Sequence, residues 1–445
     1  MAEPEAQSLR TAQQEAVQFT ADLIRIDTTN AGRGEGRERP AAEHVAALLA
    51  QAGLDPVLLE SAPGRANVVA RIAGRLPAAG GLLMHGHLDV VPADPADWSV
   101  HPFSGEIRDG SVWGRGAIDM KNTVAVLVAI ARHWARTGQQ PPRDVVLAFT
   151  ADEEDTAQYG AAWLVDHHRD LLDSCTEAVG ESGGFTFHAG GGLRIYPIAS
   201  AERGTAWLRL TARGQAGHGS KPNAANAVAR LAAAVSRISE YRWPVRLTPT
   251  VSAAIEAISA AVASQSGEVR GPVDPVDPLA GLGPAGTLVR GTMRNSAAPT
   301  MLSAGYKVNV IPAEATGYVD GRVLPGYDAE FRAAMDELTG PDVEWDYYHS
   351  EIPLEAPWDC ALVGAMRAAV EQVDPGAVCV PYCMTGGTDA KQFARLGMNC
   401  YGFTPLVLPP GYDYYANFHG TDEHVPVAAL EAAVTATDWL LRAAG

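Results

Sequence analysis

The sequence predicts an α/β protein with a smaller α+β insertion. A nearly continuous apolar run at 144–150 is typical of a central strand that is covered on both faces of a sheet. Helical and strand patterns alternate over residues 12–201, which favours a sheet with many parallel pairs. After this point the order becomes β-α-β-β-α-β, as in a split βαβ unit. With 445 residues, the chain is long enough for two domains.

The first part alternates between helices and strands. Apolar residues at helical spacing predict helices over 12–26, 40–52, 117–136 and 160–168. Apolar runs predict strands over 57–59, 67–72, 81–91, 144–150 and 176–180. The chain is expected to return to this part through a helix at 361–372, a strand at 399–403 and a helix at 427–444. We therefore assign residues 1–201 and 355–445 to one domain.

The second part is expected to be an inserted domain of residues 202–354. Alternating apolar residues predict its strands at 205–213, 287–294, 307–323 and 343–348. Its helices are predicted at 223–241 and 328–338, the first with an apolar stripe along one face.

Charge and composition exclude several functional classes. The chain has 34 basic and 52 acidic residues, a formal net charge of −18, which disfavours nucleic acid as a partner. No apolar run is long enough to span a membrane, and the acidic N-terminus lacks a signal-peptide pattern. Five scattered cysteines do not form a disulfide pattern. We therefore expect a cytoplasmic protein that binds neither nucleic acid nor membrane.

Acidic residues follow three of the predicted strands. His87 and Asp89 lie on one face of a strand end, because side chains alternate along a strand. The Glu153–Glu154 pair follows the central apolar run, and Glu181 follows the next strand. In open α/β sheets, sites form beyond the carboxyl ends of the strands. These positions therefore indicate a site that contains several carboxylates and an imidazole.

Asp119 and His419 would complete a ligand set for two divalent metals, which needs a bridging carboxylate and terminal His and carboxylate ligands. Asp119 could instead cap the helix predicted at 117–136. Glu153 and Glu154 are adjacent, so their side chains diverge. One can bind metal while the other acts as a general base.

Three further features have both a functional and a structural interpretation. His218, in a glycine-flanked loop, could donate to an oxyanion or have no role. Arg322 could bind a carboxylate through two hydrogen bonds or be a surface residue. Residues 180–184 fit the G-x-S-x-G serine-hydrolase pattern, but the glycines after Ser182 do not favour the helix that this motif needs.

In order along the chain, these residues resemble the motifs of the M20 metallopeptidase family, which includes aminoacylase-1, succinyl-diaminopimelate desuccinylase, acetylornithine deacetylase and carboxypeptidase G. The matching segments are Gly86–Pro92, Gly114–Lys121, Asp152–Glu154, Glu181, Gly217–Ser220, Asn309–Ala313, Gly386–Ala390 and Phe418–Gly420. The resemblance covers most of the chain. It implies a di-zinc exopeptidase-like catalytic domain with a mixed, largely parallel sheet, and an inserted ferredoxin-like domain that serves as lid and dimerisation unit.

The resemblance also implies the metal ligands. His87 and Glu181 would hold one zinc ion, and Glu154 and His419 the other. Asp119 would bridge the two. Two Zn²⁺ ions per subunit are therefore expected, with Co²⁺ or Mn²⁺ as substitutes.

Catalytic roles follow from the same resemblance. Asp89 would orient His87, Glu153 would be the general base, and His218 would hold the oxyanion, either within its own subunit or in the partner subunit of a homodimer. The implied substrate-binding residues are Asn309, Arg322, Gly387 and Thr388.

The expected function is hydrolysis of an amide bond in N-acyl amino acids or small peptides. A dipeptidase or carboxypeptidase of the same family is an alternative, and a metal-retaining binding protein without turnover is an alternative from another class. Residues 406–418 carry several aromatic side chains, including Tyr414 and Tyr415, next to His419. These rings either line an acyl or side-chain pocket or pack as a surface loop.

Overall fold

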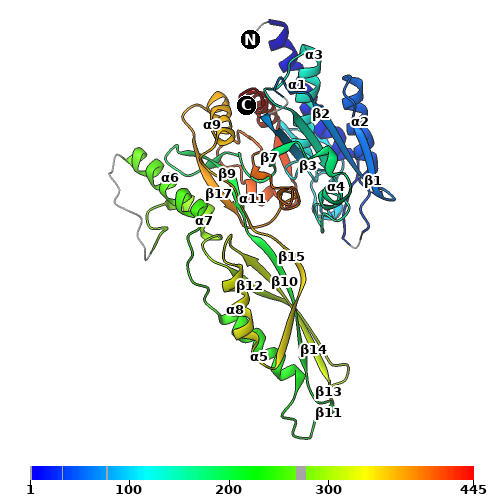
Figure 1. The fold of residues 1–445 in the computed structure, drawn as a ribbon, viewed down its shortest axis with the longest axis vertical. Coiled ribbons are helices and arrows are strands. Elements are labelled where there is room, and N and C mark those ends of the chain that lie inside the picture. Colours follow the sequence, from blue (N-terminus) through cyan, green and yellow to red (C-terminus); the bar gives the residue numbers. More distant parts are fainter. Residues whose placement is uncertain (1–2, 33, 77–78, 267–276) are drawn as a thin grey trace.

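The computed structural model describes residues 3–32, 34–76, 79–266 and 277–445. Two sheets organise these residues. A ten-stranded sheet with its helices forms the upper body in Figure 1, and a four-stranded sheet with two helices extends away from it as a long arm. No helix among the described residues has the length and apolar character that a membrane crossing requires.

The large sheet is mixed, with parallel pairs at its centre. Its strand order is β1 (Val57–Ala62), β2 (Arg65–Ile72), β6 (Val145–Thr150), β3 (Gly81–His87), β7 (Cys175–Gly180), β18 (Asn399–Gly402), β9 (Arg194–Glu202) and β16 (Leu354–Glu355), with β8 (Phe187–His188) and β17 (Val378–Met384) also paired to β9. Strands β6, β3, β7 and β18 run parallel, while β1, β2 and β16 pair antiparallel. The predicted α/β class and mixed sheet are confirmed.

Helices cover both faces of this sheet, which explains the apolar runs of its central strands. In β3, Leu82 and Met84 pack in one hydrophobic cluster and Leu83 packs in another, on the opposite face. The first face is covered by α1 (Glu3–Arg25), α2 (Arg39–Gln51), α3 (Lys121–Thr137), α9 (Ala361–Val373) and α12 (Val427–Ala443). The second is covered by α4 (Ala161–His167) and α10 (Ala390–Ala394). A small sheet of β4 (Glu106–Arg108), β5 (Ser111–Trp113) and β19 (His424–Pro426) lies beside them.

The arm is an antiparallel sheet with two helices on one face. Its order is β12 (Ser296–Ala304), β14 (Glu314–Val323), β10 (Gly204–Arg213) and β15 (Val343–Glu351). Helices α5 (Ala227–Glu240) and α8 (Asp328–Thr339) pack on it through a separate hydrophobic cluster. The short pair β11 (Gly217–His218) and β13 (Val310–Ile311) lies at the far end of the arm (Figure 1). The β-α-β-β-α-β order is therefore present.

One segment differs from its prediction. A strand was expected at 287–294, but the chain forms α7 (Thr287–Arg290) there. Leu288 and Val289 are adjacent, and both are buried against α6 (Pro249–Ser266) in a cluster that includes Val380 of the large sheet. Neighbouring side chains of a strand would point to opposite faces, so a helical turn buries this pair better. The second arm strand is β12 instead.

Candidate metal centre

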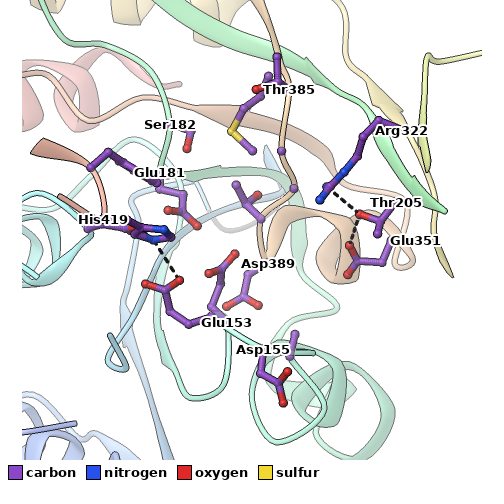
Figure 2. Close-up of a pocket in the computed structure, with 18 of the residues that line it drawn as sticks. Glu153, Asp155, Glu181, Ser182, Thr205, Arg322, Glu351, Thr385, Asp389 and His419 are labelled. Carbon is purple, nitrogen blue, oxygen red and sulfur yellow. Dashed lines mark hydrogen bonds and ion pairs between the residues drawn. The ribbon is translucent and has the colours of Figure 1, made fainter. Parts of the chain in front are cut away.

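The order of the central strands gathers the predicted residues. Strands β6, β3 and β7 are parallel neighbours, so their carboxyl ends meet at one edge of the sheet. His87 ends β3, the Glu153–Glu154 pair follows β6, and Glu181 follows β7. Figure 2 shows Glu153, Glu181 and the ring of His419 pointing into one cavity. The residues brought together here are separated by up to 332 positions in the chain.

Asp119 lies at the centre of the cluster. Its Oδ1 is 2.9 Å from Nε2 of His87, and its Oδ2 is 2.8 Å from Nε2 of His419. Nε2 of His419 is also 3.2 Å from a carboxylate oxygen of Glu154. Nε2 of His87 lies 3.7 Å from Glu181. A carboxylate between two imidazoles, each with a further carboxylate, is the donor set of a two-metal site.

The residues of the cluster fit divalent cations. One ligand atom from each of His87, Asp119 and Glu154 lies within 4.8 Å of the others, and the same holds for His87, Glu153 and Glu181. Oε1 of Glu154 is buried without a hydrogen-bond partner, as expected of an atom that binds an ion. Nitrogen and carboxylate oxygen are preferred ligands of zinc.

Without a bound cation, burial makes the charged form of these carboxylates unfavourable. Burial, and then the nearby charge of Asp119, raises the pKa of Glu154 to about 7. Burial raises the pKa of Glu181 to about 8. Burial, followed by the charge of Glu181, raises the pKa of Glu153 well above its usual value. Bound cations would compensate the negative charge that these groups concentrate.

Asp89 contacts the cluster through both its main chain and its side chain. Nδ1 of His87 lies 2.9 Å from the main-chain oxygen of Asp89, and 3.6 Å from its carboxylate. The closest group that orients the ring is therefore the carbonyl. The Asp89 carboxylate instead accepts hydrogen bonds from the main-chain N–H groups of Glu153 and Glu154, both over 3.2 Å.

Asp119 does not cap a helix. Helix α3 begins at Lys121, and its N-cap is Met120, so Asp119 lies before the cap position. Its carboxylate faces the imidazoles of His87 and His419.

Sequence reasoning missed Glu423, a fully buried residue that organises this loop. Its carboxylate accepts hydrogen bonds from the main-chain N–H groups of Gly116, Ile118 and Asp119. It also pairs with Arg115 over 2.7 Å. The only local signal was its position shortly after the predicted ligand His419.

A cavity of about 420 Å³ adjoins the cluster. Asp119, Glu153, Glu154, Glu181 and His419 line one part of it. The predicted substrate residues Arg322, Gly387 and Thr388 line another part, and Figure 2 shows Arg322 beside Thr205 and Glu351, away from His419. The apolar wall consists of Phe185, Trp207, Tyr382, Met384, Tyr414, Tyr415 and Phe418.

The aromatic residues near His419 form a packed group that reaches the cavity. The rings of Phe185 and Tyr414 stack with centroids 3.8 Å apart, and Tyr415 meets Phe185 edge-on at 5.6 Å. Tyr414 is buried, whereas Tyr415 keeps 48% of its surface exposed. The segment is therefore both packed and part of the cavity wall.

His218 and Asn309 lie away from the cavity and the cluster around Asp119. Both are exposed at the far end of the arm, where Gly219 donates a main-chain hydrogen bond to Asn309 over 3.0 Å. Neither lines the cavity. Nδ1 of His218 accepts hydrogen bonds from the N–H and hydroxyl of Ser220, so a neutral ring carries its proton on Nε2. The ring can thus donate outward.

Ser182 lacks the structure of a serine-hydrolase elbow. It lines the cavity, but the residues that follow it lead into the short strand β8 rather than a helix. The motif requires a helix directly after its serine.

Known proteins resemble this chain in sequence and in fold. The model of peptidase family M20/M25/M40 matches residues 83–443. The N-fatty-acyl-amino acid synthase/hydrolase PM20D1 of Homo sapiens is 29% identical over 384 residues, covering 82% of this chain and 74% of the relative. A probable succinyl-diaminopimelate desuccinylase of Staphylococcus epidermidis is 27% identical over 422 residues, covering 93% of this chain and 94% of that protein.

Solved structures share the fold. The M20 family metallo-carboxypeptidase Sso-CP2 from Sulfolobus solfataricus superimposes with a TM-score of 0.69 at 17% identity, covering 96% of this chain and 99% of that chain. Human carnosine dipeptidase 1 gives a TM-score of 0.67 at 16% identity, covering 99% of both chains. Because the family model matches residues 83–443, the chain is a hydrolase that belongs to peptidase family M20/M25/M40.

Proposed function

We propose that this protein is a di-zinc amidohydrolase that cleaves N-acyl amino acids or small peptides with a free carboxylate. The observation that carries the proposal is the position of Asp119 between the imidazoles of His87 and His419, at the edge of a cavity that also contains Arg322. The names of the PM20D1 and desuccinylase relatives support an N-acyl amino acid as the substrate class.

The ligand atoms divide between two cations. His87 and Glu181 would hold one zinc ion, Glu154 and His419 the other, and Asp119 would bridge them. The two ions, when bound, would acidify a water molecule and polarise the substrate carbonyl.

Glu153 is the proposed general base. It belongs to the cluster of His87 and Glu181 and lines the cavity. Burial raises its pKa, which favours proton uptake from water and later donation to the leaving amine. Glu154, by contrast, is 3.2 Å from His419, a distance suited to a shared cation.

Arg322 is proposed to bind the substrate carboxylate. Its side chain lines the cavity and is held by Asp320, with Nε 2.9 Å from Oδ1. Thr205 accepts a weaker hydrogen bond from it over 3.4 Å. A guanidinium recognises a carboxylate through two parallel hydrogen bonds. The aromatic wall beside His419 would then receive the acyl group or side chain.

A homodimer would complete the site. We propose that the arm is the inserted lid and dimerisation domain, and that His218 and Asn309 act in the cavity of the partner subunit, because they lie at the arm's far end in their own. Met301 and Leu302 on strand β12 are 63% and 60% exposed, and within the described residues β12 pairs with β14 alone. An apolar strand with a free edge suits pairing with a second copy.

The test is a hydrolysis screen of N-acyl amino acids and dipeptides with added Zn²⁺ or Co²⁺. We expect turnover that a chelator removes and metal restores. Glu153→Gln and Glu153→Ala should abolish turnover while two metal ions per subunit remain bound. Near-normal activity in either variant would refute the role of Glu153, and hydrolysis of dipeptides alone would favour the peptidase alternative.

A further inference from the structure

A buried polar chain lies behind the acidic loop and does not line the cavity. It reaches the side chain of a proposed metal ligand at one point, where Asp89 lies beside the ring of His87. It begins at Asp152, the residue before Glu153, which adopts a φ of +67°. Its Oδ1 accepts hydrogen bonds from Arg65 over 2.6 Å and from Asn30 over 3.1 Å. Its Oδ2 accepts from the main-chain N–H of Tyr159 over 3.2 Å. The first acid of the loop is thus an anchor to the protein interior.

Asn30 connects this anchor to Asp89. Its amide nitrogen donates to Oδ1 of Asp152 and, over 2.9 Å, to Oδ2 of Asp89. The main-chain N–H of Asn30 donates to Val90 over 2.9 Å, which fixes the residue beside β3. The amide group of Asn30 therefore fixes the positions of the two buried carboxylates relative to each other.

Asp89 connects this chain of hydrogen bonds to the loop that carries Glu153 and Glu154 and to His87. Its carboxylate accepts from the N–H groups of Glu153 and Glu154, and its carbonyl oxygen lies 2.9 Å from the ring of His87. A shift of Asp152 or Asn30 would therefore move both glutamates relative to His87.

Arg65 supplies the positive charge of the chain. Its side chain is 1% exposed and pairs with the fully buried Glu38 over 2.7 Å, as well as with Asp152. The guanidinium also lies over the ring of Tyr159, 4.7 Å from its centroid. Removing one partner of such a buried pair leaves an uncompensated charge, so the chain acts as a unit.

We propose that Arg65 and Asn30 are positioning residues, which set the separation of Glu153 and Glu154 from His87 through Asp152 and Asp89. The roles of Glu153 and Glu154 rest on the function proposed above. Groups that hold the ligands of a metal change its affinity even though they do not touch it.

The chain offers a matched control on the same strand. Arg71 also lies on β2, and it pairs with Asp144, the residue directly before β6, whereas Arg65 pairs with Asp152, which follows the end of β6. Its side chain is 51% exposed. Arg71→Met removes an arginine–aspartate pair between the same two strands, at the edge remote from the site.

The experiment compares Arg65→Met, Arg65→Lys and Arg71→Met. Co²⁺ affinity is measured by equilibrium dialysis, kcat and KM with an N-acyl amino acid, and folding by circular dichroism. For Arg65→Met we expect Co²⁺ affinity and kcat to fall about 10–100-fold with little change in KM. Arg65→Lys should recover part of the Co²⁺ affinity and part of kcat. Lysine restores the positive charge, but it cannot contact Glu38 and Asp152 simultaneously as the guanidinium does. Arg71→Met should keep wild-type values.

Two outcomes would overturn the proposal. The first is an Arg65→Met protein with a lower Tm but wild-type Co²⁺ affinity and kcat, since a structural role alone gives that result. The second applies if Arg65→Met does not fold: Asn30→Ala, which leaves the Arg65–Glu38 pair intact, must then weaken Co²⁺ binding, and a wild-type affinity refutes the proposal. Because Co²⁺ binding needs no substrate, this result stands even if no N-acyl amino acid is hydrolysed.

Discussion

The carboxylate of Glu423 accepts a hydrogen bond from the main-chain N–H of Asp119 over 3.1 Å. The same carboxylate pairs with Arg115, whose guanidinium also donates to the carbonyl oxygen of His419 over 3.2 Å. Glu423 therefore joins the two loops that carry Asp119 and His419, although it does not contribute a ligand atom to the cluster.

Glu423→Gln should weaken metal binding. An amide has only one oxygen to accept from the N–H groups of Ile118 and Gly116, and its NH₂ group cannot pair with Arg115. We expect a loss of about 10–100-fold in Co²⁺ affinity, measured by equilibrium dialysis. Unchanged affinity in a folded variant would show that the loops hold their positions without this carboxylate.

His218 should act in the partner subunit. We expect His218→Ala to lower kcat about 10²–10³-fold, as the loss of one oxyanion donor does. Co-expression of His218→Ala with Glu153→Ala should restore about one quarter of wild-type activity, because each mixed dimer keeps one complete site. If His218 acts within its own subunit, the mixed protein stays as inactive as its two parents.

Glu202 should make stability depend on pH. It accepts hydrogen bonds from the N–H and hydroxyl of Thr388, and burial raises its pKa from 4.5 to about 7. Between these values the folded chain keeps the proton that the unfolded chain releases. This group therefore lowers the free energy of unfolding as pH rises from 4.5 to 7, by at most about 3 kcal/mol.

The Glu202→Gln variant lacks this titration. Denaturant unfolding of wild type and variant at several pH values, at one metal concentration, measures the effect. The variant should have the flatter profile across this window. Parallel profiles of unfolding free energy against pH would mean that Glu202 has the same pKa in the folded and the unfolded chain.

Tyr415 should contribute to acyl preference. Its half-exposed ring lines the cavity. We expect Tyr415→Ala to lower kcat/KM about 10-fold for N-acyl amino acids with aromatic or long acyl chains, and to leave N-acetyl substrates unaffected. Tyr348→Ala, at a 66% exposed tyrosine that does not line the cavity, is the control. Equal losses for all acyl groups would contradict a role in selectivity.

The central strands could be predicted because their sequence pattern and environment agree. Strand β6 is buried along its whole length, and the apolar run at 144–150 needs no knowledge of its neighbours. The acidic residues after β6 and β7 were found for the same reason, since a strand end is a local signal. Their convergence then follows from parallel pairing.

Other features depend on distant partners. Strand β12 contains Pro299 at a register shift and pairs on one side only, so its pattern resembles a loop. Asn30 and Arg65 carry no local signal, because Asp152 and Asp89 are contacted only in the folded chain. The position of His218 depends on the length and direction of the whole arm, which no motif encodes.

The segment that contains α6 and α7 has a mechanical consequence. The chain leaves the large sheet after β9, returns from α5 to α6, leaves again from α7 to β12 and returns from β15 to β16. Four covalent crossings thus tether the arm, where a plain insertion has two. We expect the arm to swing through a smaller angle than a two-tether hinge allows, so that substrate entry relies more on side-chain rearrangement around the cavity than on opening of the arm.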